Sequence, residues 1–294
     1  IAEKRVPQDG RMKLVLSKTH AIDFRVSTLP TLQGEKIVMR ILDPTSATLG
    51  IEALGYEPEQ KATLLDAISR PYGMVLVTGP TGSGKTVSLY TCLNILNKDG
   101  INISTAEDPA EINLAGINQV NVDDRAGLTF PVALKAFLRQ DPDIIMVGEI
   151  RDLETAEISI KAAQTGHLVL STLHTNDAPS AITRLLDLGV PHYLIASTVN
   201  GVLAQRLVRT LCPHCKAPDT LTDADWAPLR HAHEALPDVV TAYAPVGCLE
   251  CRRTGYMGRI GLYELLPLGS RLRALITRDM DLAGFSKAAA ADGL

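Results

Sequence analysis

Residues 79–86 read Gly79-Pro80-Thr81-Gly82-Ser83-Gly84-Lys85-Thr86 and fit the pattern G-x-x-x-x-G-K-[ST]. The apolar run 74–78 comes directly before them and suits a buried parallel strand. After them, apolar residues recur at helical spacing at Leu89, Cys92, Leu93 and Leu96. A phosphate-binding loop of this pattern needs such a strand and such a helix on its two sides. The stretch therefore predicts a strand, a glycine-rich loop and a helix, in that order.

The chemistry of this loop predicts a bound nucleoside triphosphate. Glycines allow the backbone to wrap closely around phosphate oxygens, while successive N–H groups and the helix N-terminus supply positive potential. Lys85 can reach the β- and γ-phosphates, and the Thr86 hydroxyl can hold Mg²⁺. We expect residues 79–87, which end at Val87, to bind ATP. The alternative is a glycine-rich turn without a ligand, which the flanking strand and helix disfavour.

The length and charge of the chain limit the classes of protein to which it can belong. At 294 residues the chain exceeds an ordinary single domain, so one large core with smaller attachments is expected. Its apolar stretches are short and residues 1–10 carry charges, which predicts a soluble protein that is not exported. A net charge of −4 and a pI near 6.0 show that the chain lacks the overall positive charge typical of proteins that bind nucleic acid. Because the chain starts at Ile1 without methionine and stops within an alanine-rich pattern, we expect a fragment of a longer protein.

The order of predicted strands and helices indicates the fold class. Alternating runs at 11–16 and 22–26 read as antiparallel strands, and from residue 74 to about 209 apolar strands alternate with helices. This alternation is typical of a mainly parallel α/β sheet. Strands are expected at 74–78, 101–106, 144–147 and 168–173, and helices at 59–68, 153–165 and 178–188. The expected parts are a partial β domain (1–43), a linker (44–58), an ATP-binding core (59–210), a tetracysteine subdomain (211–256) and a truncated helical segment (257–294).

Acidic residues follow two of the predicted strands. In open α/β sheets the ligand lies beyond the carboxyl ends of the strands. Glu107 and Asp108 follow one strand, and Glu149 follows another, with Gly148 at the place of the usual Walker B aspartate. Glu107 is our candidate for the general base that orients the attacking water and Glu149 for the Mg²⁺ ligand, and the sequence permits the two roles to be exchanged. The alternative for Glu107 and Asp108 is a helix cap or a solvated loop.

Two histidines, His167 and His174, stand at the two ends of the strand-like run 168–173. Their odd separation places their side chains on opposite faces of an unbroken strand, so they cannot both be simple ligands on one face. His174, at the carboxyl end, is the candidate that senses the γ-phosphate or passes its state to a neighbouring subunit, while His167 is expected to be structural. Considered alone, each histidine is more often a hydrogen-bonded framework residue.

Four of the five cysteines occur as two CxxC pairs: Cys212 with Cys215, and Cys248 with Cys251. Four thiolates on two tight turns suit tetrahedral Zn²⁺ in a structural site without an open coordination position, and His214 is a less favoured substitute ligand. Because residues 216–247 make a longer spacing than common zinc ribbons have, a redox pair or disulfides are the alternatives. A cytosolic chain disfavours lasting disulfides. Cys92 lies on the apolar helix stripe and is expected to be a buried thiol.

Several motifs together resemble the type II/IV secretion ATPase superfamily over nearly the whole chain. They are QDGR at 8–11, IDFRVST at 22–28, GPTGSGKT at 79–86, STAEDPAE at 104–111, FLRQDPDIIMVGEIRD at 137–152 and AQTGHLVLSTLHTNDA at 163–178. The sequence of residues 103–121 and the four-cysteine insertion are most similar to those of the family branch that drives type IV pilus assembly. The resemblance implies a RecA-like core, a PAS-like N-terminal domain that acts in trans, and a ring-shaped homo-hexamer on the cytoplasmic face of a bacterial inner membrane.

The resemblance also implies roles for residues of this chain. The acids of the family's Asp box match Glu107 and Asp108, its Walker B acid matches Glu149, and its His box matches His167 and His174. Except for His167, which precedes its strand, these are the residues that follow the predicted strands, so the resemblance and the strand pattern select one edge of the sheet.

Arginines of the small β domain are a further feature that the resemblance implies. The family's arginines that project onto phosphates across a subunit boundary match Arg25 and Arg40, which would otherwise be ordinary surface arginines. A positive charge at the γ-phosphate can stabilise the transition state, which gives a reason for a ring. Arg139 and Arg151 flank the Walker B strand and are weaker candidates, because either can pair with a structural acid.

The first functional hypothesis is an ATP-hydrolysing ring that moves an inner-membrane platform protein, so that pilin subunits are extracted and polymerised, and that meets the membrane through its partners. The rival within the family is the type II secretion ATPase, whereas retraction motors lack the cysteine insertion. From other classes, a DNA translocase is opposed by the acidic balance, and no nucleic-acid partner is expected. A nucleotide-gated scaffold that barely hydrolyses ATP is favoured by the missing Walker B aspartate.

Overall fold

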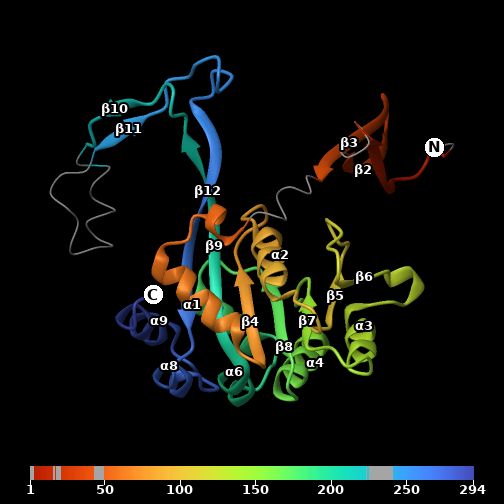
Figure 1. Ribbon diagram of the computed structural model, residues 1–294, viewed down its shortest axis with the longest axis vertical. Helices are drawn as coiled ribbons and strands as arrows, with labels where there is room; N and C mark the ends of the chain where they lie inside the picture. The colour runs from red at the N-terminus through yellow and green to blue at the C-terminus, as the bar shows by residue number, and fades with distance from the viewer. Residues whose placement is uncertain (1–2, 16, 18–20, 43–49, 223, 225–240) are drawn as a thin grey trace. The chain divides into compact units, whose positions relative to one another are not determined.

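The computed structural model describes the chain except for residues 1–2, 16, 18–20, 43–49, 223 and 225–240 (Figure 1). Three antiparallel strands form a first sheet in the order β1-β2-β3: β1 (Gln8–Val15), β2 (Ala21–Thr31) and β3 (Gly34–Leu42). The antiparallel strands expected from the alternating sequence are therefore confirmed. The register places Met12 opposite Phe24 and Phe24 opposite Ile41, so these side chains share one apolar face.

The central sheet has seven strands in the order β12-β9-β4-β8-β7-β5-β6 (Figure 1). The pairs β4/β8, β4/β9, β7/β8, β5/β7 and β5/β6 are parallel, which confirms the mainly parallel α/β core. β4, β7 and β8 are buried along their whole length. The strand bounds are β4 Gly73–Thr78, β5 Ile103–Glu107, β6 Asn118–Asn121, β7 Ile144–Val147, β8 Leu168–Leu173, β9 Val199–Leu211 and β12 Tyr256–Pro267.

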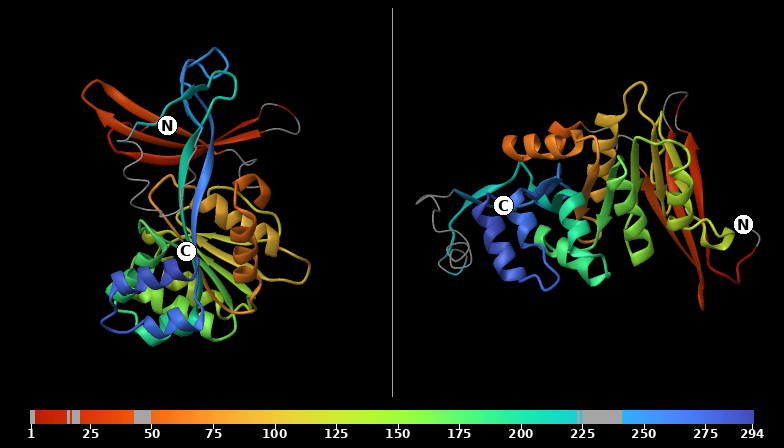
Figure 2. Two further views of the ribbon diagram at one scale, coloured as in Figure 1. Left: turned by 90° about the vertical axis from the view of Figure 1, so that its left-hand side faces the viewer. Right: turned by 90° about the horizontal axis from the view of Figure 1, so that it is seen from below.

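Helices cover both faces of the central sheet. In the right-hand view of Figure 2, α1 in orange lies on one side of the sheet and the blue C-terminal helices lie on the other. One apolar cluster joins α1 and α2 to strand residues such as Val75, and a second joins the remaining helices to alternate residues such as Met74. The helix bounds are α1 Pro58–Ser69, α2 Lys85–Leu96, α3 Phe130–Phe137, α4 Leu153–Gln164, α5 Ala178–Asp187, α6 His192–Thr198, α8 Ser270–Leu275 and α9 Leu282–Ala291.

The predicted core elements are confirmed with small shifts at their ends, and β7 and β8 coincide with the predicted strands. The expectation of a helical segment over residues 257–294 is wrong at its start, because β12 occupies most of the first part of that range. Gly258 and Gly261 oppose a helix there, and pairing with β9 stabilises the strand. Helices appear only in the later part of the range, as α8 and α9.

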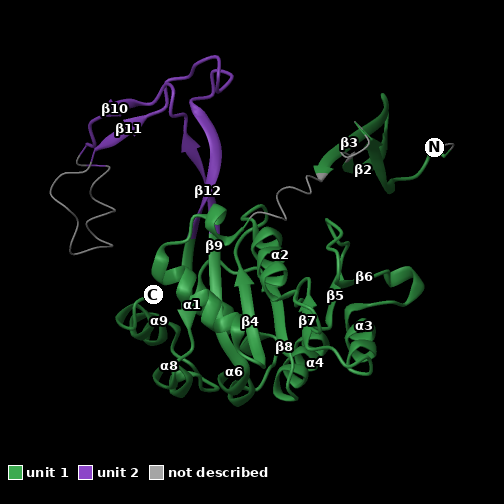
Figure 3. Ribbon diagram, in the orientation of Figure 1, with its two compact units in different colours: residues 1–205, 263–294 green, residues 206–262 purple. Residues whose placement is uncertain are grey.

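The chain divides into two compact units, which Figure 3 colours separately. Unit 1 contains residues 1–205 and 263–294, and unit 2 contains residues 206–262. Unit 2 holds a short antiparallel pair, β10 (Ala217–Asp219) and β11 (Ala242–Ala244). Of the linker expected at 44–58, residues 44–49 lie outside the described part of the chain. Among the described residues, no helix combines the length and the apolar character that crossing a membrane requires.

Candidate nucleotide site and metal centre

The glycine-rich loop joins β4 to α2 at the carboxyl edge of the parallel strands, as the motif predicts. Gly79 and Gly84 have φ angles of 142° and 89°, a region that favours glycine. A Cβ atom at Gly79 would lie 2.4 Å from the backbone oxygen of Gln205, so the loop approaches β9 too closely for any side chain at this position. Gly84 is the N-cap of α2, whose first turn begins with Lys85, Thr86 and Val87. The loop therefore ends at a helix N-terminus, which suits an anion.

The Lys85 side chain folds back over its own loop. Its Nζ donates to the backbone oxygens of Gly79 at 2.7 Å and Pro80 at 3.2 Å. Burial lowers the pKa of Lys85, and the negative charge of Glu149 opposes that shift. Neighbouring loop residues Pro80, Thr81 and Gly82 are exposed, whereas Ser83 is buried. The lysine is thus close to the predicted phosphate site and to the Walker B acid.

Glu107 ends β5 in a buried position and accepts hydrogen bonds from three side chains. Its carboxylate receives the Tyr90 hydroxyl, the Thr105 hydroxyl at 2.6 Å and the Gln119 amide at 3.0 Å. Only 5% of the residue is exposed. Neither a helix cap nor a solvated loop describes this carboxylate, because its partners hold it in a fixed place inside the sheet edge.

Glu149 lies after β7 at the centre of a charged network. Arg151 pairs with Glu149 and, at 3.6 Å, with Asp108, while the His174 Nε2 atom lies 3.4 Å from a Glu149 oxygen. Burial alone would raise the pKa of Glu149, but the hydrogen bond and charge of Arg151, with His174, hold that pKa below its ordinary value. The network joins residues that follow β5, β7 and β8. An ionised carboxylate here suits a bound cation.

Gly148 stands where a Walker B strand usually carries aspartate, and the strand spacing explains its small size. A Cβ atom at Gly148 would lie 3.2 Å from the Ala106 oxygen and 3.5 Å from the Glu107 Cα atom of neighbouring β5. A larger side chain would have to push these strands apart. Glu149 is therefore the first acid after β7.

Glu111 is a site residue that sequence reasoning missed. Its backbone N–H donates to the Tyr90 hydroxyl at 3.1 Å, and that hydroxyl in turn donates to Glu107. Partial burial raises the pKa of Glu111 although the residue keeps an exposed surface. The charge of Arg40 opposes that shift, the charge of Glu107 adds to it, and the charge of Arg25 opposes it. The string STAEDPAE contained the signal, since it places a second glutamate four residues after the first.

Two of the weaker candidates lie apart from the charged network. The His167 Nδ1 atom lies 2.9 Å from the Ala162 oxygen, so the ring supports the turn between α4 and β8, as a framework histidine would. Arg139 follows α3 and is exposed. The structure therefore distinguishes His174 and Arg151, which meet Glu149, from these two residues.

The two arginines of the first sheet stand directly opposite each other. Arg25 on β2 pairs in register with Arg40 on β3, and Arg11 on β1 pairs with Arg25 from the other side. Directly opposed residues of antiparallel strands share one face, so three arginines form a single row. Like charges in this arrangement are unfavourable unless an anion comes close. Sequence reasoning did not select Arg11, whose signal is its register with Arg25.

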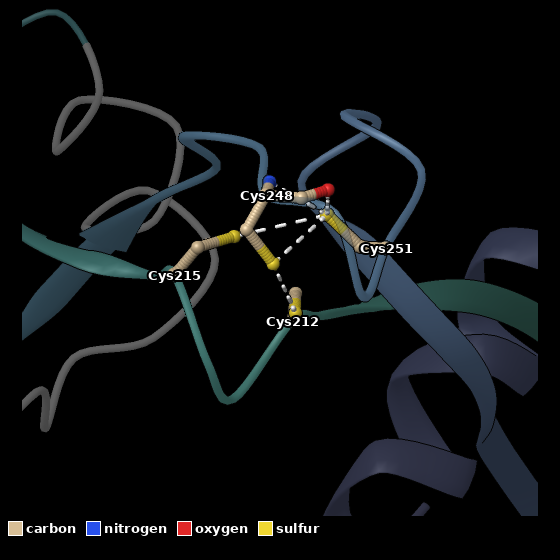
Figure 4. Close-up of side chains that lie close together, drawn as sticks. All are labelled: Cys212, Cys215, Cys248 and Cys251. Atoms are coloured by element: carbon tan, nitrogen blue, oxygen red, sulfur yellow. Dashed lines mark hydrogen bonds between the residues drawn. The ribbon is translucent and has the colours of Figure 1, made fainter.

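The four paired cysteines of unit 2 converge, as Figure 4 shows. Their sulfur atoms all lie within 4.8 Å of one another, with Cys212 to Cys248 at 3.9 Å and Cys215 to Cys251 at 3.8 Å. Four thiolates around a tetrahedral zinc, each at about 2.3 Å, would place their sulfurs roughly 3.8 Å apart. The residues present therefore fit a structural zinc site. All four are free thiols, which excludes the disulfide alternative for this conformation.

Backbone N–H groups prepare these thiols to bind a cation. The Cys248 N–H donates to the Cys251 sulfur at 3.2 Å, the Gly255 N–H does so at 3.2 Å, and the Gly247 N–H donates to Cys215 at 3.3 Å. The bond from Cys248 is the largest cause that lowers the pKa of Cys251 to about 6. Desolvation instead raises the pKa of Cys215 to about 11. Because thiolates are the form that binds metal, a cation at this cluster would displace the proton of Cys215.

Cys92 is separate from this cluster. It is buried on α2, and burial raises its pKa to about 12. The expected buried thiol is confirmed, and its protonated form is unsuited to metal binding or nucleophilic chemistry.

Comparison with known proteins shows the family of the chain. The family model described as "Type II/IV secretion system protein" matches residues 1–292. The type IV pilus assembly ATPase PilB of Acinetobacter baylyi is 61% identical over 280 residues, which cover 95% of this chain and 48% of that protein. The type II secretion system protein HxcR of Pseudomonas aeruginosa is 50% identical over 294 residues, which cover 100% of this chain and 58% of that protein.

A solved structure adds a likeness in three dimensions. The crystal structure of the pilus retraction motor PilT with bound ADP has a TM-score of 0.70 and 28% sequence identity, covering 96% of this chain and 69% of that one. The chain spans about half the length of the pilus-assembly relatives that it matches.

Proposed function

The chain belongs to the type II/IV secretion system protein family, and we propose that it binds and hydrolyses ATP as the motor part of a type IV pilus assembly machine. One observation carries the proposal: Lys85 of the glycine-rich loop, Glu149 and Glu107 lie at one edge of a parallel sheet. The 61% identity to a pilus-assembly ATPase supports the choice of machine.

In the proposed site the loop and α2 hold the phosphates. Backbone N–H groups and the N-terminus of α2 attract the anion, and Lys85 exchanges its carbonyl partners, Gly79 and Pro80, for phosphate oxygens. The Thr86 hydroxyl and the ionised Glu149 carboxylate would hold Mg²⁺, which neutralises phosphate charge when bound. Arg151 and His174 keep Glu149 in place and ionised.

For the general base we propose Glu107, with Glu149 as the alternative and Glu111 as a further candidate. The three donors that hold Glu107 fix the direction of its carboxylate, which favours an orienting role. Glu111 is a candidate because its backbone N–H donates to the Tyr90 hydroxyl that holds Glu107, and because its pKa is raised.

Glutamine variants distinguish the three candidates for the general base. Glu107→Gln, Glu111→Gln and Glu149→Gln are each measured for ATP affinity and for the rate of turnover. The proposal expects Glu107→Gln to keep ATP affinity and lose turnover. Near-normal turnover in that variant would remove Glu107 from the role and pass it to whichever of the other two variants is inactive but still binds ATP.

We also propose that the chain works in a homo-hexameric ring at the cytoplasmic face of a bacterial inner membrane, where a platform protein is its partner. The row of Arg25 and Arg40 supports this: within the chain these two charges act on Glu111, and at a subunit boundary the phosphates of a neighbouring copy would stabilise the opposed arginines further. In this proposal Arg25 and Arg40 complete the site of the next subunit. A zinc ion on the four cysteines would shape unit 2 and take no part in catalysis.

Type II secretion is the second candidate function, because HxcR matches the whole chain at 50% identity. Two chimeras distinguish the candidates: this chain replaces the matching segment of PilB in Acinetobacter baylyi, and separately that of HxcR in Pseudomonas aeruginosa. The proposal expects pili to be restored in the first host and secretion not to be restored in the second. The reverse result would favour the secretion role.

A further inference from the structure

Gln205 is a buried amide that touches the phosphate-binding loop from a neighbouring strand. It lies on β9, which pairs in parallel with β4 so that Ala204 stands opposite Thr78. Gln205 therefore continues β9 alongside Gly79, at the start of the loop, where its backbone oxygen makes the close approach already described. Only 3% of Gln205 is exposed. Its position just beyond the last residue pair of β4 and β9 lies at the edge of the sheet that carries the nucleotide site.

The Gln205 side chain makes one directed contact with the loop. Its Nε2 atom donates to the backbone oxygen of Ser83 at 2.7 Å in a buried setting. The Gln205 Oε1 atom and the Ser83 hydroxyl are both buried, and neither has a hydrogen-bond partner among the residues that the structure describes. An apolar side chain at position 205 would avoid the free-energy cost of burying an unpaired Oε1 atom. The feature that favours glutamine here is therefore the hydrogen bond from its Nε2 atom.

This contact determines which way a peptide group of the loop points. In a trans peptide the C=O and the following N–H point in opposite directions. Holding the Ser83 oxygen against Gln205 therefore turns the Gly84 N–H away from β9. Gly84 is the N-cap of α2, and its glycine backbone also tolerates the flipped arrangement. Without an anchor, the loop can present a carbonyl oxygen where a phosphate needs a donor.

We propose that Gln205 is the positioning residue that fixes the Ser83–Gly84 peptide, so that the Gly84 N–H faces the nucleotide phosphates. The inference rests on the proposed nucleotide binding by this loop and adds a residue that the motif itself does not contain. Gln205 acts through the backbone of the loop and does not touch the ligand.

The first test uses Gln205→Leu, which keeps a similar volume and removes the donor. The dissociation constant of MgADP, measured by titration calorimetry on the whole chain, should rise roughly tenfold because the buried Ser83 oxygen loses its partner. The matched control is Asn200→Leu on the same strand. Asn200 is also buried and donates to the Tyr72 oxygen at 2.9 Å, but it lies at the opposite end of the β4–β9 pairing. This control should lower the melting temperature and leave MgADP affinity within about twofold of wild type.

A second variant, Gln205→Glu, separates positioning from packing. Its carboxyl group has the shape of the amide but can donate to the Ser83 oxygen only when protonated. Relative to wild type at each pH, MgADP affinity should be low near about pH 8 and recover towards about pH 6, since burial raises a carboxyl pKa. Gln205→Leu should show no such recovery.

The outcomes are distinguishable. If wild type fails to bind MgADP, the proposed function fails and this inference with it. If wild type binds and folded Gln205→Leu binds equally well, or if Asn200→Leu weakens binding to the same extent, only the positioning role is overturned. If Gln205→Leu does not fold, Gln205→Glu decides, and affinity that is independent of pH relative to wild type contradicts the proposal.

Discussion

In unit 1 the candidate nucleotide site is assembled from the ends of several parallel strands. In unit 2 the four thiols come from two short turns, one before β10 and one after β11. The position of Glu149, for example, depends on β7 being buried between two helix layers. Cys212 and Cys251 are positioned by the knuckle geometry and would be held together by a metal. The comparison teaches that the core specifies its site by packing, while the small unit relies on ligation.

The largest effect on activity is expected from a substitution that disables the phosphate-binding loop of unit 1 and leaves unit 2 unchanged. Lys85→Ala removes the charge that reaches the phosphates and should lower ATP turnover roughly a hundredfold or more. The zinc content should be unchanged. The matched control is Lys135→Ala, an exposed lysine paired with Glu154, which should keep normal turnover. Full nucleotide affinity in Lys85→Ala would contradict the assignment of the loop.

The second prediction concerns a substitution that removes the metal site of unit 2 and leaves nucleotide binding by unit 1 unchanged. Cys251→Ser removes a thiolate ligand, so metal analysis should find the zinc content lost and limited proteolysis should cut within residues 206–262. MgADP affinity should stay within about twofold of wild type, because packing holds the loop. Cys92→Ala, in the fifth cysteine, should leave the zinc content intact. Equal loss of zinc in both variants would contradict the tetracysteine assignment.

The smallest effect tests how firmly unit 1 holds its charged network. Because the pKa of Glu149 is lowered in the folded chain, its pairing stabilises the fold above the ordinary carboxyl pKa, and that stabilisation is lost as the pH falls through the lowered value. Arg151→Ala should therefore reduce the free energy of unfolding at about pH 7, by less than about 1 kcal/mol after solvent screening. The difference from wild type should shrink as the pH falls below the ordinary carboxyl pKa of about 4.3 and disappear once the pH is below the lowered pKa of Glu149. Urea denaturation checks this. Arg139→Ala is the control, and a difference that persists in acid would assign another role to Arg151.

Local patterns made the core predictable. The apolar run before the loop and the helical spacing after it gave β4 and α2, and the acids after β5 and β7 identified the correct edge of the sheet. The resemblance stated from the motifs is confirmed by the family model over residues 1–292. Each of these features lies within one short segment of the chain, so that segment alone contains the pattern that predicts it.

Contacts between distant segments escaped prediction. Gln205 touches Ser83 across 122 residues, and Tyr90 on α2 meets Glu107 on β5 only after the sheet has formed. β12 lies where the sequence predicts a helical segment, because pairing with β9 stabilises the strand and its own sequence does not reveal that partner. The missed features depend on which strands become neighbours.

The most direct measurement is the ATPase rate per chain against protein concentration, with the mass of the assembly determined in the same samples. Arg25→Ala and Arg40→Ala are compared with wild type and with Lys36→Ala, a control on the same strand as Arg40 and an even number of residues away. The account predicts a rate that rises steeply as rings form and falls in both arginine variants but not in the control. A rate that is flat with concentration and unchanged by either arginine substitution would contradict a ring motor with shared sites.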